Sequence, residues 1–379
     1  MRLAFCIFNY FPFGGLERDF MAISRECLTR GHDLNVFTME WEGKVPAGMN
    51  IDFIACKGMT NHEKIKKFAQ NLPAHLKRSE YDLLVGFNRI PHLDVYYAAD
   101  VCYTKRIERQ RTFLARLTPR YRLFSTYEKS IFSPESSTDI IYLSGQEKRN
   151  YQDAYGTPDN RFHYAPPGVD TQRIQSFLGK ENRKKIRTEL RLAAEDNFLL
   201  MIGSNFHTKG VDRSLHALAA LPRHLKKSTS LFIIGKGDHK KYVALARKMG
   251  VENQVRFLGG RDDVPRFLAG ADLLLQPSLT ENTGNAIVEA LVAGIPVLAT
   301  QTCGYAEHVM KAQAGKVIPC DPFRQEQMNF LLQEMLTSPD RNRWRDNALT
   351  YAAQTDLSSR PVVVADLLEI IADSKRSLR

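Results

Sequence analysis

The chain has 379 residues, of which 43% are hydrophobic and 25% are charged, and its net charge is +11. A chain of this length is longer than a domain built on a single hydrophobic core usually is, so we expect two globular domains. The positive balance indicates an acidic partner, which leaves nucleic acid, anionic lipid and phosphorylated substrates open. No apolar run approaches the roughly 20 residues of a membrane-spanning helix, and the N-terminus does not resemble a signal peptide. We therefore expect a cytoplasmic protein.

The six cysteines are scattered, without a Cys-x-x-Cys pair or a nearby Cys/His group. This spacing favours reduced thiols and argues against structural zinc.

The first ten residues read as a buried strand, and a glycine pair follows it. Gly14 and Gly15 precede a helical pattern, so backbone without side chains can approach a diphosphate there. The pair is not a Gly-x-Gly-x-x-Gly fingerprint, and alone it is weak evidence. Further strands at 33–38, 51–55 and 82–86 alternate with helical segments. This alternation predicts a parallel sheet with helices on both faces.

Three polar residues follow the strand expected at 82–86, namely His92, Asp94 and Asp100. Open α/β sheets bind ligands beyond the carboxyl ends of their strands, so each is a candidate catalytic or acceptor-positioning group. Capping or salt bridging is the simpler interpretation of His92 and Asp94. For Asp100 both interpretations stay open.

Residues 103–132 carry eight basic side chains and only two acidic ones. Apolar residues recur at helical spacing through this segment, with an interruption near Pro119. Such a segment suits an anionic membrane interface, while a solvated helix face and a nucleic-acid surface are the alternatives. The arginines expected to face the membrane are Arg106, Arg109, Arg111, Arg116, Arg120 and Arg122.

The segment 164–170, which contains two prolines and a glycine, breaks the pattern and predicts a joint between domains. We expect a first domain at 1–166 and a second at 167–359, with the helical tail 360–379 as a candidate to cross back onto the first. Strand patterns near 198–203, 231–235, 255–260 and 273–276, and later at 295–300 and 315–318, predict a second parallel sheet. The sequence thus predicts an α/β protein with two Rossmann-like domains and an interdomain cleft.

Three cations of the second half are candidates for binding a diphosphate. Lys209 follows the strand at 198–203 and precedes a helix, and Arg261 follows a later strand. Arg173, just past the joint, is within reach of the same cleft. Because no Asp-x-Asp pair is present to hold a divalent metal, these cations and backbone amides would stabilise the leaving group themselves.

The segment 278–294 carries the strongest signal in the chain. An apolar strand turns through Gly284 into a helix, with Glu281 before the turn and Glu289 inside the helix. The amides from Gly284 to Ala286 suit a phosphate, Glu289 suits a ribose, and Glu281 suits a sugar hydroxyl. The alternative is an ordinary strand–turn–helix with two exposed glutamates.

Several motifs together make the chain resemble the retaining family 4 glycosyltransferases of the GT-B fold, and among them the bacterial lipopolysaccharide core glucosyltransferases. The resemblance covers nearly the full length. Its most specific runs are Phe-Pro-Phe-Gly-Gly at 11–15 and Ala-Ala-Asp-Val-Cys-Tyr at 98–103. The Glu-x7-Glu element, Pro-Pro-Gly at 166–168 and Lys-Gly-Val-Asp-Arg at 209–213 add to it.

The resemblance implies roles for individual residues. Gly15 would contact the donor diphosphate, and Asp100 would face the acceptor. The amides of Thr283, Gly284, Asn285 and Ala286 would surround sugar and phosphate. The remaining donor-binding residues are Arg173, Thr208, Lys209, Arg261, Glu281 and Glu289. Two departures stand out. Thr208 occupies a position that is often basic, and the turn at 282–285 is more polar than is usual, which bears on the donor sugar.

The implied activity is transfer of glucose from UDP-glucose onto an inner-core heptose of lipopolysaccharide, with retention and without a metal or other cofactor. Catalysis would rest on Asp100, Lys209 and Glu281, and the enzyme would sit on the cytoplasmic face of the inner membrane. Other UDP-sugars, a nucleotide-sugar 2-epimerase, and a basic lipid-binding or nucleic-acid-binding protein remain alternatives.

Overall fold

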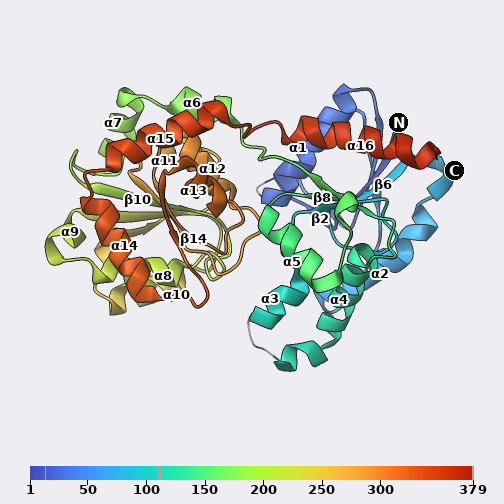
Figure 1. Cartoon of the computed structure of the whole chain (residues 1–379), viewed down its shortest axis with the longest axis horizontal. Coiled ribbons are helices and arrows are strands. Elements are labelled where there is room, and N and C mark those ends of the chain that lie inside the picture. Colours follow the sequence, from blue (N-terminus) through green and yellow to red (C-terminus); the bar gives the residue numbers. More distant parts are fainter. Residues whose placement is uncertain (13, 110–112, 378–379) are drawn as a thin grey trace. The chain divides into compact units, whose positions relative to one another are not determined.

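The computed structural model describes residues 1–12, 14–109 and 113–377. The chain forms two compact units (Figure 1). The first unit comprises Met1–Gly168 and Ser359–Arg379, and the second is Val169–Ser358. The first boundary lies within the segment 164–170 that we expect to be the joint.

The described part of the first unit contains a parallel sheet with the strand order β5-β3-β1-β6-β7-β8-β9. The strands are β1 Arg2–Cys6, β3 Asp33–Thr38, β5 Met49–Phe53, β6 Leu83–Gly86, β7 Val95–Ala98, β8 Asp139–Tyr142 and β9 Phe162–Tyr164. A separate short parallel pair joins β2 (Asn9–Tyr10) to β4 (Glu40–Trp41). The sequence pattern misses β7, because all four of its residues are buried and none alternates with a polar one.

Successive residues of this sheet enter two different cores. Leu3 and Phe5 of β1 pack with α1 and α16 on one face, while Ala4 and Cys6 pack with α2, α4 and α5 on the other. This is the period of two that a strand covered on both faces imposes. The helices are α1 Gly15–Thr29, α2 Asn61–His75, α3 Tyr103–Arg109, α4 Pro119–Phe132, α5 Gly145–Tyr155 and α16 Arg360–Ser377, with short 3₁₀ turns at Arg78–Glu80, Phe113–Leu117 and Asp159–Arg161.

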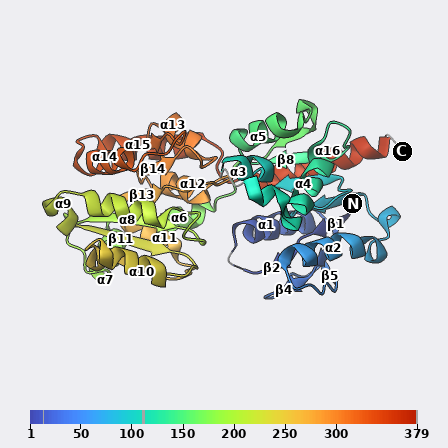
Figure 2. The same ribbon diagram turned by 90° about the horizontal axis from the view of Figure 1, so that it is seen from below.

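Helix α16 crosses back onto the first unit and lies along α1 (Figures 1 and 2). Val364, Leu368 and Ile371 belong to the same core as β1. Arg360, only 1% exposed, donates to the Pro166 carbonyl at 2.8 Å and pairs with Asp19 at 2.7 Å. These contacts make the last helix an integral part of the first unit.

The described part of the basic segment contains α3, the 3₁₀ turn Phe113–Leu117 and α4. The interruption expected near Pro119 is the start of α4, where Thr118 accepts a hydrogen bond from the Tyr121 amide as the N-cap. Proline is favourable at this first helical position because it has no N–H to leave unbonded. At the far end of α4, Ile131 is fully buried, whereas Leu117 before the break is 59% exposed. The apolar positions therefore do not share one face.

The second unit has a parallel sheet with the order β12-β11-β10-β13-β14-β15 among the described residues. The strands are β10 Asn197–Ile202, β11 Thr229–Ile234, β12 Val255–Phe257, β13 Leu273–Gln276, β14 Val297–Thr300 and β15 Gly315–Ile318. Leu200 faces a core built with α6, α7, α11, α12 and α13, and Leu199 faces one built with α8, α10 and α14.

Helix α15 contacts α12 and α13 beside the second sheet. The helices of this unit are α6 Thr171–Phe177, α7 Lys180–Glu189, α8 Val211–Ala220, α9 Arg223–Lys227, α10 Lys240–Lys248, α11 Val264–Gly270, α12 Asn285–Val292, α13 Ala306–Ala312, α14 Gln325–Thr337 and α15 Arg341–Gln354, with a 3₁₀ turn at Glu252–Gln254. Among the described helices of both units, none combines the length and the apolar character needed to cross a bilayer.

Candidate functional site

The candidate donor site lies at the carboxyl edge of the second sheet, where the strand order reverses. From β10 the chain builds outward through β11 and β12, then returns to place β13 on the other side of β10. Such a switch point leaves a crevice, because the loops after the two strands diverge to opposite faces. The loop after β10 carries Lys209, and the loop after β13 carries Glu281.

Lys209 and Glu281 form an ion pair through Nζ and Oε1. The other carboxylate oxygen, Oε2, accepts from Gln276 Nε2 and from Ser278 Oγ, both at 2.8 Å. Gln276 and Ser278 are essentially buried, whereas the side chains of Lys209 and Glu281 keep 20% and 15% of their surface exposed. Residues of the sheet thus hold the pair on one side, and solvent or a ligand can contact it on the other side.

The ionisation of Glu281 follows from these partners. Burial alone would raise the pKa of its carboxyl group, but the Lys209 charge and the hydrogen bonds from Lys209, Gln276 and Ser278 outweigh burial and hold the pKa below its usual range. Glu281 is therefore a carboxylate at neutral pH, suited to accept hydrogen bonds from hydroxyl groups and unsuited to donate a proton.

Two glycines set the position of the Lys209 side chain. Gly203 has φ +147°, and a Cβ there would lie 2.5 Å from Lys209 Cε. Gly210 has φ +71°, and a Cβ there would lie 2.2 Å from the Pro277 carbonyl oxygen. A side chain at position 203 would displace the Lys209 side chain itself, and one at position 210 would push the loop after β10 away from the loop after β13.

The turn into α12 places backbone amides beside this pair. Gly284 is the N-cap of α12 and contributes no side-chain capping bond, so the first amides of the helix keep their capacity for an anion. The turn itself is fixed, because the Thr283 carbonyl accepts from the Tyr305 amide at 2.8 Å. Asn285 Oδ1 is buried without a hydrogen-bond partner in the described structure. Ala286 is buried and Glu289 half-buried on the same helix.

The other two candidate cations lie on different elements, Arg261 on the loop after β12 and Arg173 on α6. Arg261 binds Asp263 with both ends of its guanidinium, at 2.6 and 2.8 Å, and lies over the Phe267 ring. Arg173 donates to the carbonyl of Asp262. In the described structure no hydrogen bond or ion pair connects either arginine to Lys209. The Thr208 carbonyl accepts from the Leu279 amide at 2.8 Å, so that residue fastens the two loops together.

In the first unit, Gly15 is the first residue of α1, and Asp100 follows β7 at the carboxyl edge. The Asp100 side chain is 51% exposed, with its Oδ2 3.8 Å from Arg89 Nη2. Burial raises the pKa of Glu17, on the first turn of α1, and the negative charge of Asp100 raises it further. The carboxylates of Glu17 and Asp100 are therefore close enough to repel.

Asp94 does not lie at the carboxyl end of a strand, so its placement beyond a strand end is wrong, while the simpler interpretation, salt bridging, is confirmed. Because β7 begins at Val95, Asp94 precedes this strand, where it pairs with Arg78 and accepts from the Leu84 amide at 2.6 Å. His92 is an exposed residue in the left-handed region, with φ 63°.

A buried hydrogen-bond network holds α3 and α4 of the basic segment together. The sequence pattern does not reveal this network. Glu128 of α4, with no exposed side-chain surface, lies 3.3 Å from Arg89. Glu128 also accepts from the amides of Tyr103 and Thr104 at 2.8 and 3.0 Å, and from the Tyr155 hydroxyl at 2.7 Å. It thereby binds the first amides of α3, the usual place for a carboxylate on a helix.

The described arginines of the basic segment have different surroundings. Arg106 covers the Tyr103 ring at 4.9 Å, and Arg109 donates to Asn150 of α5 at 3.0 Å. Arg116 pairs with Glu108 at 3.4 Å, Arg120 lies over the Phe124 ring at 5.7 Å, and Arg122 is exposed. Arg111, and Phe13 of the early glycine motif, lie outside the described residues. In the 3₁₀ turn Phe113–Leu117 between the two helices, Leu114 is 76% exposed.

No group of three or more His, Cys, Asp or Glu side chains suited to a metal ion occurs within residues 1–12, 14–109 and 113–377. The expected independence from metal stays a prediction.

Comparison with known proteins decides the family. Residues 13–173 match the model of Glycosyltransferase Family 4, and residues 182–350 match that of Glycosyl transferases group 1. The lipopolysaccharide glucosyltransferase WaaG of Escherichia coli K12 is 42% identical over 369 residues, which span 97% of this chain and 98% of WaaG. The chain belongs to the family 4 glycosyltransferases. It is thus an enzyme that transfers a sugar.

Solved structures agree with the fold of this glycosyltransferase. A crystal structure of WaaG, described as a glycosyltransferase involved in lipopolysaccharide biosynthesis, matches with a TM-score of 0.91 and covers 97% of this chain and 99% of that one. Anabaena HepE, solved with UDP and glucose, matches over 100% of both chains with a TM-score of 0.71 at 19% identity. HepE therefore supports the fold alone.

Proposed function

We propose that this glycosyltransferase moves glucose from UDP-glucose onto an inner-core heptose of lipopolysaccharide, with retention of the anomeric configuration. One observation carries the proposal. The Lys209–Glu281 pair lies beside the amides that open α12, at the switch point of a chain 42% identical to a lipopolysaccharide glucosyltransferase along nearly its whole length. A cation, helix amides and a held carboxylate are the groups that a nucleotide-sugar needs.

In this proposal the donor lies along the second unit. Glu289 accepts from the ribose, the amides of 283–286 bind phosphate and sugar, and Glu281 accepts from a hydroxyl of the hexose. Lys209, paired with the Glu281 carboxylate, stabilises the charge that develops on the departing UDP. Arg261, on the loop after β12, and Arg173, on α6, supply further positive charge. The contact of Gly15, the first residue of α1, with the diphosphate stays a prediction. No metal is required.

The chemistry proposed is a same-face displacement. The bond from the anomeric carbon to the UDP oxygen breaks, the acceptor hydroxyl attacks from the same side, and the leaving phosphate takes the hydroxyl proton. Glu281 cannot serve as the proton donor because it is ionised at neutral pH. Asp100 is the acceptor-side carboxylate in the first unit, and it is exposed enough to contact a sugar.

We further propose that the basic segment binds the cytoplasmic face of the inner membrane, where a lipid-linked acceptor is found. Exposed Leu114 and Leu117 supply apolar contact, and Arg116, Arg120 and Arg122 supply positive charge near them. Leucines flanked by arginines are suited to the boundary between acyl chains and anionic headgroups.

The test is acceptor-dependent release of UDP from UDP-glucose, with deacylated core lipopolysaccharide as acceptor. Replacement of Lys209 by Ala should lower kcat by roughly 10²–10³, since it removes stabilisation of transition-state charge. Glu281→Ala should abolish detectable turnover. Lys311→Ala is the matched control, because that exposed lysine of α13 pairs only with Glu307 one turn away among its described contacts.

Two results would contradict the proposal. An increase in KM at unchanged kcat in Lys209→Ala would restrict that lysine to ground-state binding. Release of UDP from UDP-N-acetylglucosamine or UDP-galactose, but not from UDP-glucose, would overturn the donor assignment and direct attention to Thr283 and Asn285.

A further inference from the structure

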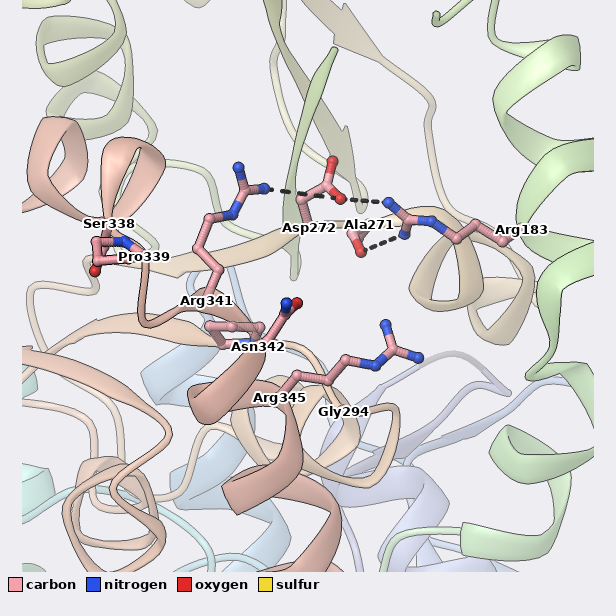
Figure 3. Close-up of a pocket in the computed structure, with 10 residues that line it drawn as sticks. Arg183, Ala271, Asp272, Gly294, Ser338, Pro339, Arg341, Asn342 and Arg345 are labelled. Atoms are coloured by element: carbon pink, nitrogen blue, oxygen red, sulfur yellow. Dashed lines mark hydrogen bonds and ion pairs between the residues drawn. The ribbon is translucent and has the colours of Figure 1, made fainter. Parts of the chain in front are cut away.

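A second candidate site lies in the second unit at the edge of the sheet opposite to Lys209 and Glu281. It is a cavity of about 420 Å³ between the segments that lead into β13 and β14 and the start of α15 (Figure 3). Because the strands are parallel, this amino edge is separated from the carboxyl edge by the length of the strands. The lining residues are Arg183, Ala271, Asp272, Gly294, Pro296, Ser338, Pro339, Arg341, Asn342 and Arg345.

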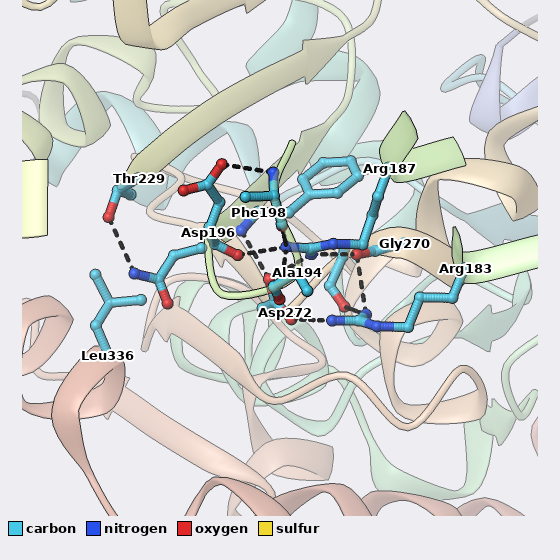
Figure 4. A network of polar contacts seen from close by, with 12 residues as sticks. Arg183, Arg187, Ala194, Asp196, Phe198, Thr229, Gly270, Asp272 and Leu336 are labelled. Atoms are coloured by element: carbon cyan, nitrogen blue, oxygen red, sulfur yellow. Dashed lines mark hydrogen bonds and ion pairs between the residues drawn. The ribbon is translucent and has the colours of Figure 1, made fainter. Parts of the chain in front are cut away.

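The charge of this cavity is not balanced by its own side chains. Three of the lining residues are arginines, and the one lining carboxylate is Asp272. That carboxylate already pairs with Arg183 and with Arg187, the latter at 3.0 Å, and it accepts from the Phe198 amide at 2.8 Å (Figure 4). It also pairs with Arg341 at 3.9 Å (Figure 3). One negative charge is thus shared among three guanidinium groups before Arg345 is considered.

The remaining contacts of these arginines are to neutral acceptors, which do not offset charge. Arg183 donates to the carbonyls of Gly270 and Ala271 at 3.0 and 3.1 Å. Arg341 donates to Asn197 Oδ1 at 3.2 Å and to the Leu336 carbonyl at 3.4 Å. These bonds hold two guanidinium groups in place at the cavity, so that an anion would meet a pre-formed arrangement of donors.

The start of α15 adds a further positive contribution. Asp340 stands at the N-cap of this 14-residue helix but makes no side-chain capping bond. Its carboxylate instead pairs with Arg343 at 3.0 Å. The positive end of the helix and its first amides therefore accompany Arg341 and Arg345 at the cavity wall.

We propose that this cavity binds the phosphate group of a small anionic ligand, either a soluble phosphorylated compound or a phospholipid headgroup. Arg183, Arg187 and Arg341 have a structural task as well, since they fix Asp272 and the edge of the sheet. Arg345 takes part in none of these bonds, is exposed on α15 and lines the cavity. The fold therefore does not depend on the charge of Arg345, and this charge is available to bind a ligand.

The test is a calorimetric titration with inorganic pyrophosphate of three proteins, each with Lys209→Ala to weaken the contribution of the proposed donor site. They are this parent, Arg345→Glu and, as matched control, Arg343→Glu. Arg343 lies on the same helix, undergoes the same change of charge and does not line the cavity. Arg345→Glu should weaken binding by at least about tenfold, whereas Arg343→Glu should leave it unchanged.

The source of the phosphate is separated by a second arm with vesicles of phosphatidylglycerol, in which each protein also carries Leu114→Ser to weaken binding through the basic segment. A selective loss of vesicle binding in Arg345→Glu assigns the site to a lipid headgroup, and a selective loss of pyrophosphate binding alone assigns it to a soluble ligand. Equal losses in both variants, or no saturable binding to either probe at about 10 mM, would overturn the proposal. An unchanged melting temperature of Arg345→Glu verifies that the fold is intact.

Discussion

The two units each contain an ion pair at the carboxyl edge of the sheet, and the two pairs differ in what surrounds them. Arg89 and Glu128 in the first unit are 7% and 0% exposed, and Glu128 is occupied by two amides and a hydroxyl. Lys209 and Glu281 in the second unit are 20% and 15% exposed, with hydrogen bonds to Glu281 from the sheet side. The first pair is closed by protein, and the second is open on one side.

This difference separates structural from functional charge. A buried pair whose carboxylate is occupied by protein donors has no exposed side for a substrate, and loss of either member leaves a buried charge with less compensation. A pair that is partly exposed costs less to separate, and a ligand phosphate or hydroxyl can replace one partner. We therefore expect substitutions at the first pair to lower stability and substitutions at the second to lower turnover.

The largest effect on stability is expected for Glu128→Ala. It leaves buried Arg89 with only the more distant and half-exposed Asp100 as a counter-charge, and it removes the acceptor of the Tyr103 and Thr104 amides. This should cost about 3–5 kcal/mol of unfolding free energy. Urea denaturation measures this cost. Glu108→Ala, at a side chain that is 42% exposed, is the control and should change stability by less than about 0.5 kcal/mol. Similar losses in both variants would refute the structural role of Glu128.

A smaller effect, confined to membrane binding, is expected for Leu114→Ser in the 3₁₀ turn of the basic segment. Removal of one exposed leucine should weaken partition into phosphatidylglycerol vesicles by about tenfold without a change in melting temperature, because its side chain has little protein contact to lose. Vesicle sedimentation measures the partition. Phe330→Ser, at an exposed residue of α14, is the control, and an equal loss there would mean that the segment has no special role.

The smallest effect is expected for Ser278→Ala, which removes one hydrogen bond from the Glu281 carboxylate. At neutral pH turnover should fall by roughly threefold to tenfold, the equivalent of about 0.5–1.5 kcal/mol. In the wild type the lowered pKa keeps Glu281 ionised as the pH falls past the usual range of a glutamate. Loss of the bond raises that pKa, so the acid limb of kcat/KM against pH should move to higher pH. An unmoved acid limb would contradict the role of Ser278.

Much of the architecture follows from local pattern. Apolar runs that end in glycine loops predict β10, β11 and β13, and the break at Pro119 predicts the start of α4. The sequence pattern does not predict the strand β7, because burial on both faces removes the alternation of polar and apolar residues that identifies a strand. Without β7, the sequence analysis also misplaces Asp94, which lies just before this strand. Short buried strands of this kind are recognised from tertiary packing rather than from their own residues.

The candidate site divides in the same way. Lys209 and Glu281 attract notice because each follows a strand and precedes a helix, but their pairing depends on the adjacency of β10 and β13, which sequence spacing does not encode. Gln276 reads as the polar end of an apolar strand, although its amide holds the carboxylate. Arg89 and Glu128 lie 39 positions apart by number and meet only because α4 packs beside the sheet. Contacts of this range require the fold first.

The return of α16 to the first unit has a consequence for synthesis on the ribosome. The core of that unit includes Val364, Leu368 and Ile371, and the buried Asp19 pairs with Arg360. The second unit is continuous from Val169 to Ser358, so its whole core emerges before the last helix of the first. The unit that is translated first is therefore completed last. Until then the face of β1 and α1 that α16 covers remains apolar and exposed, a natural site for a chaperone to hold.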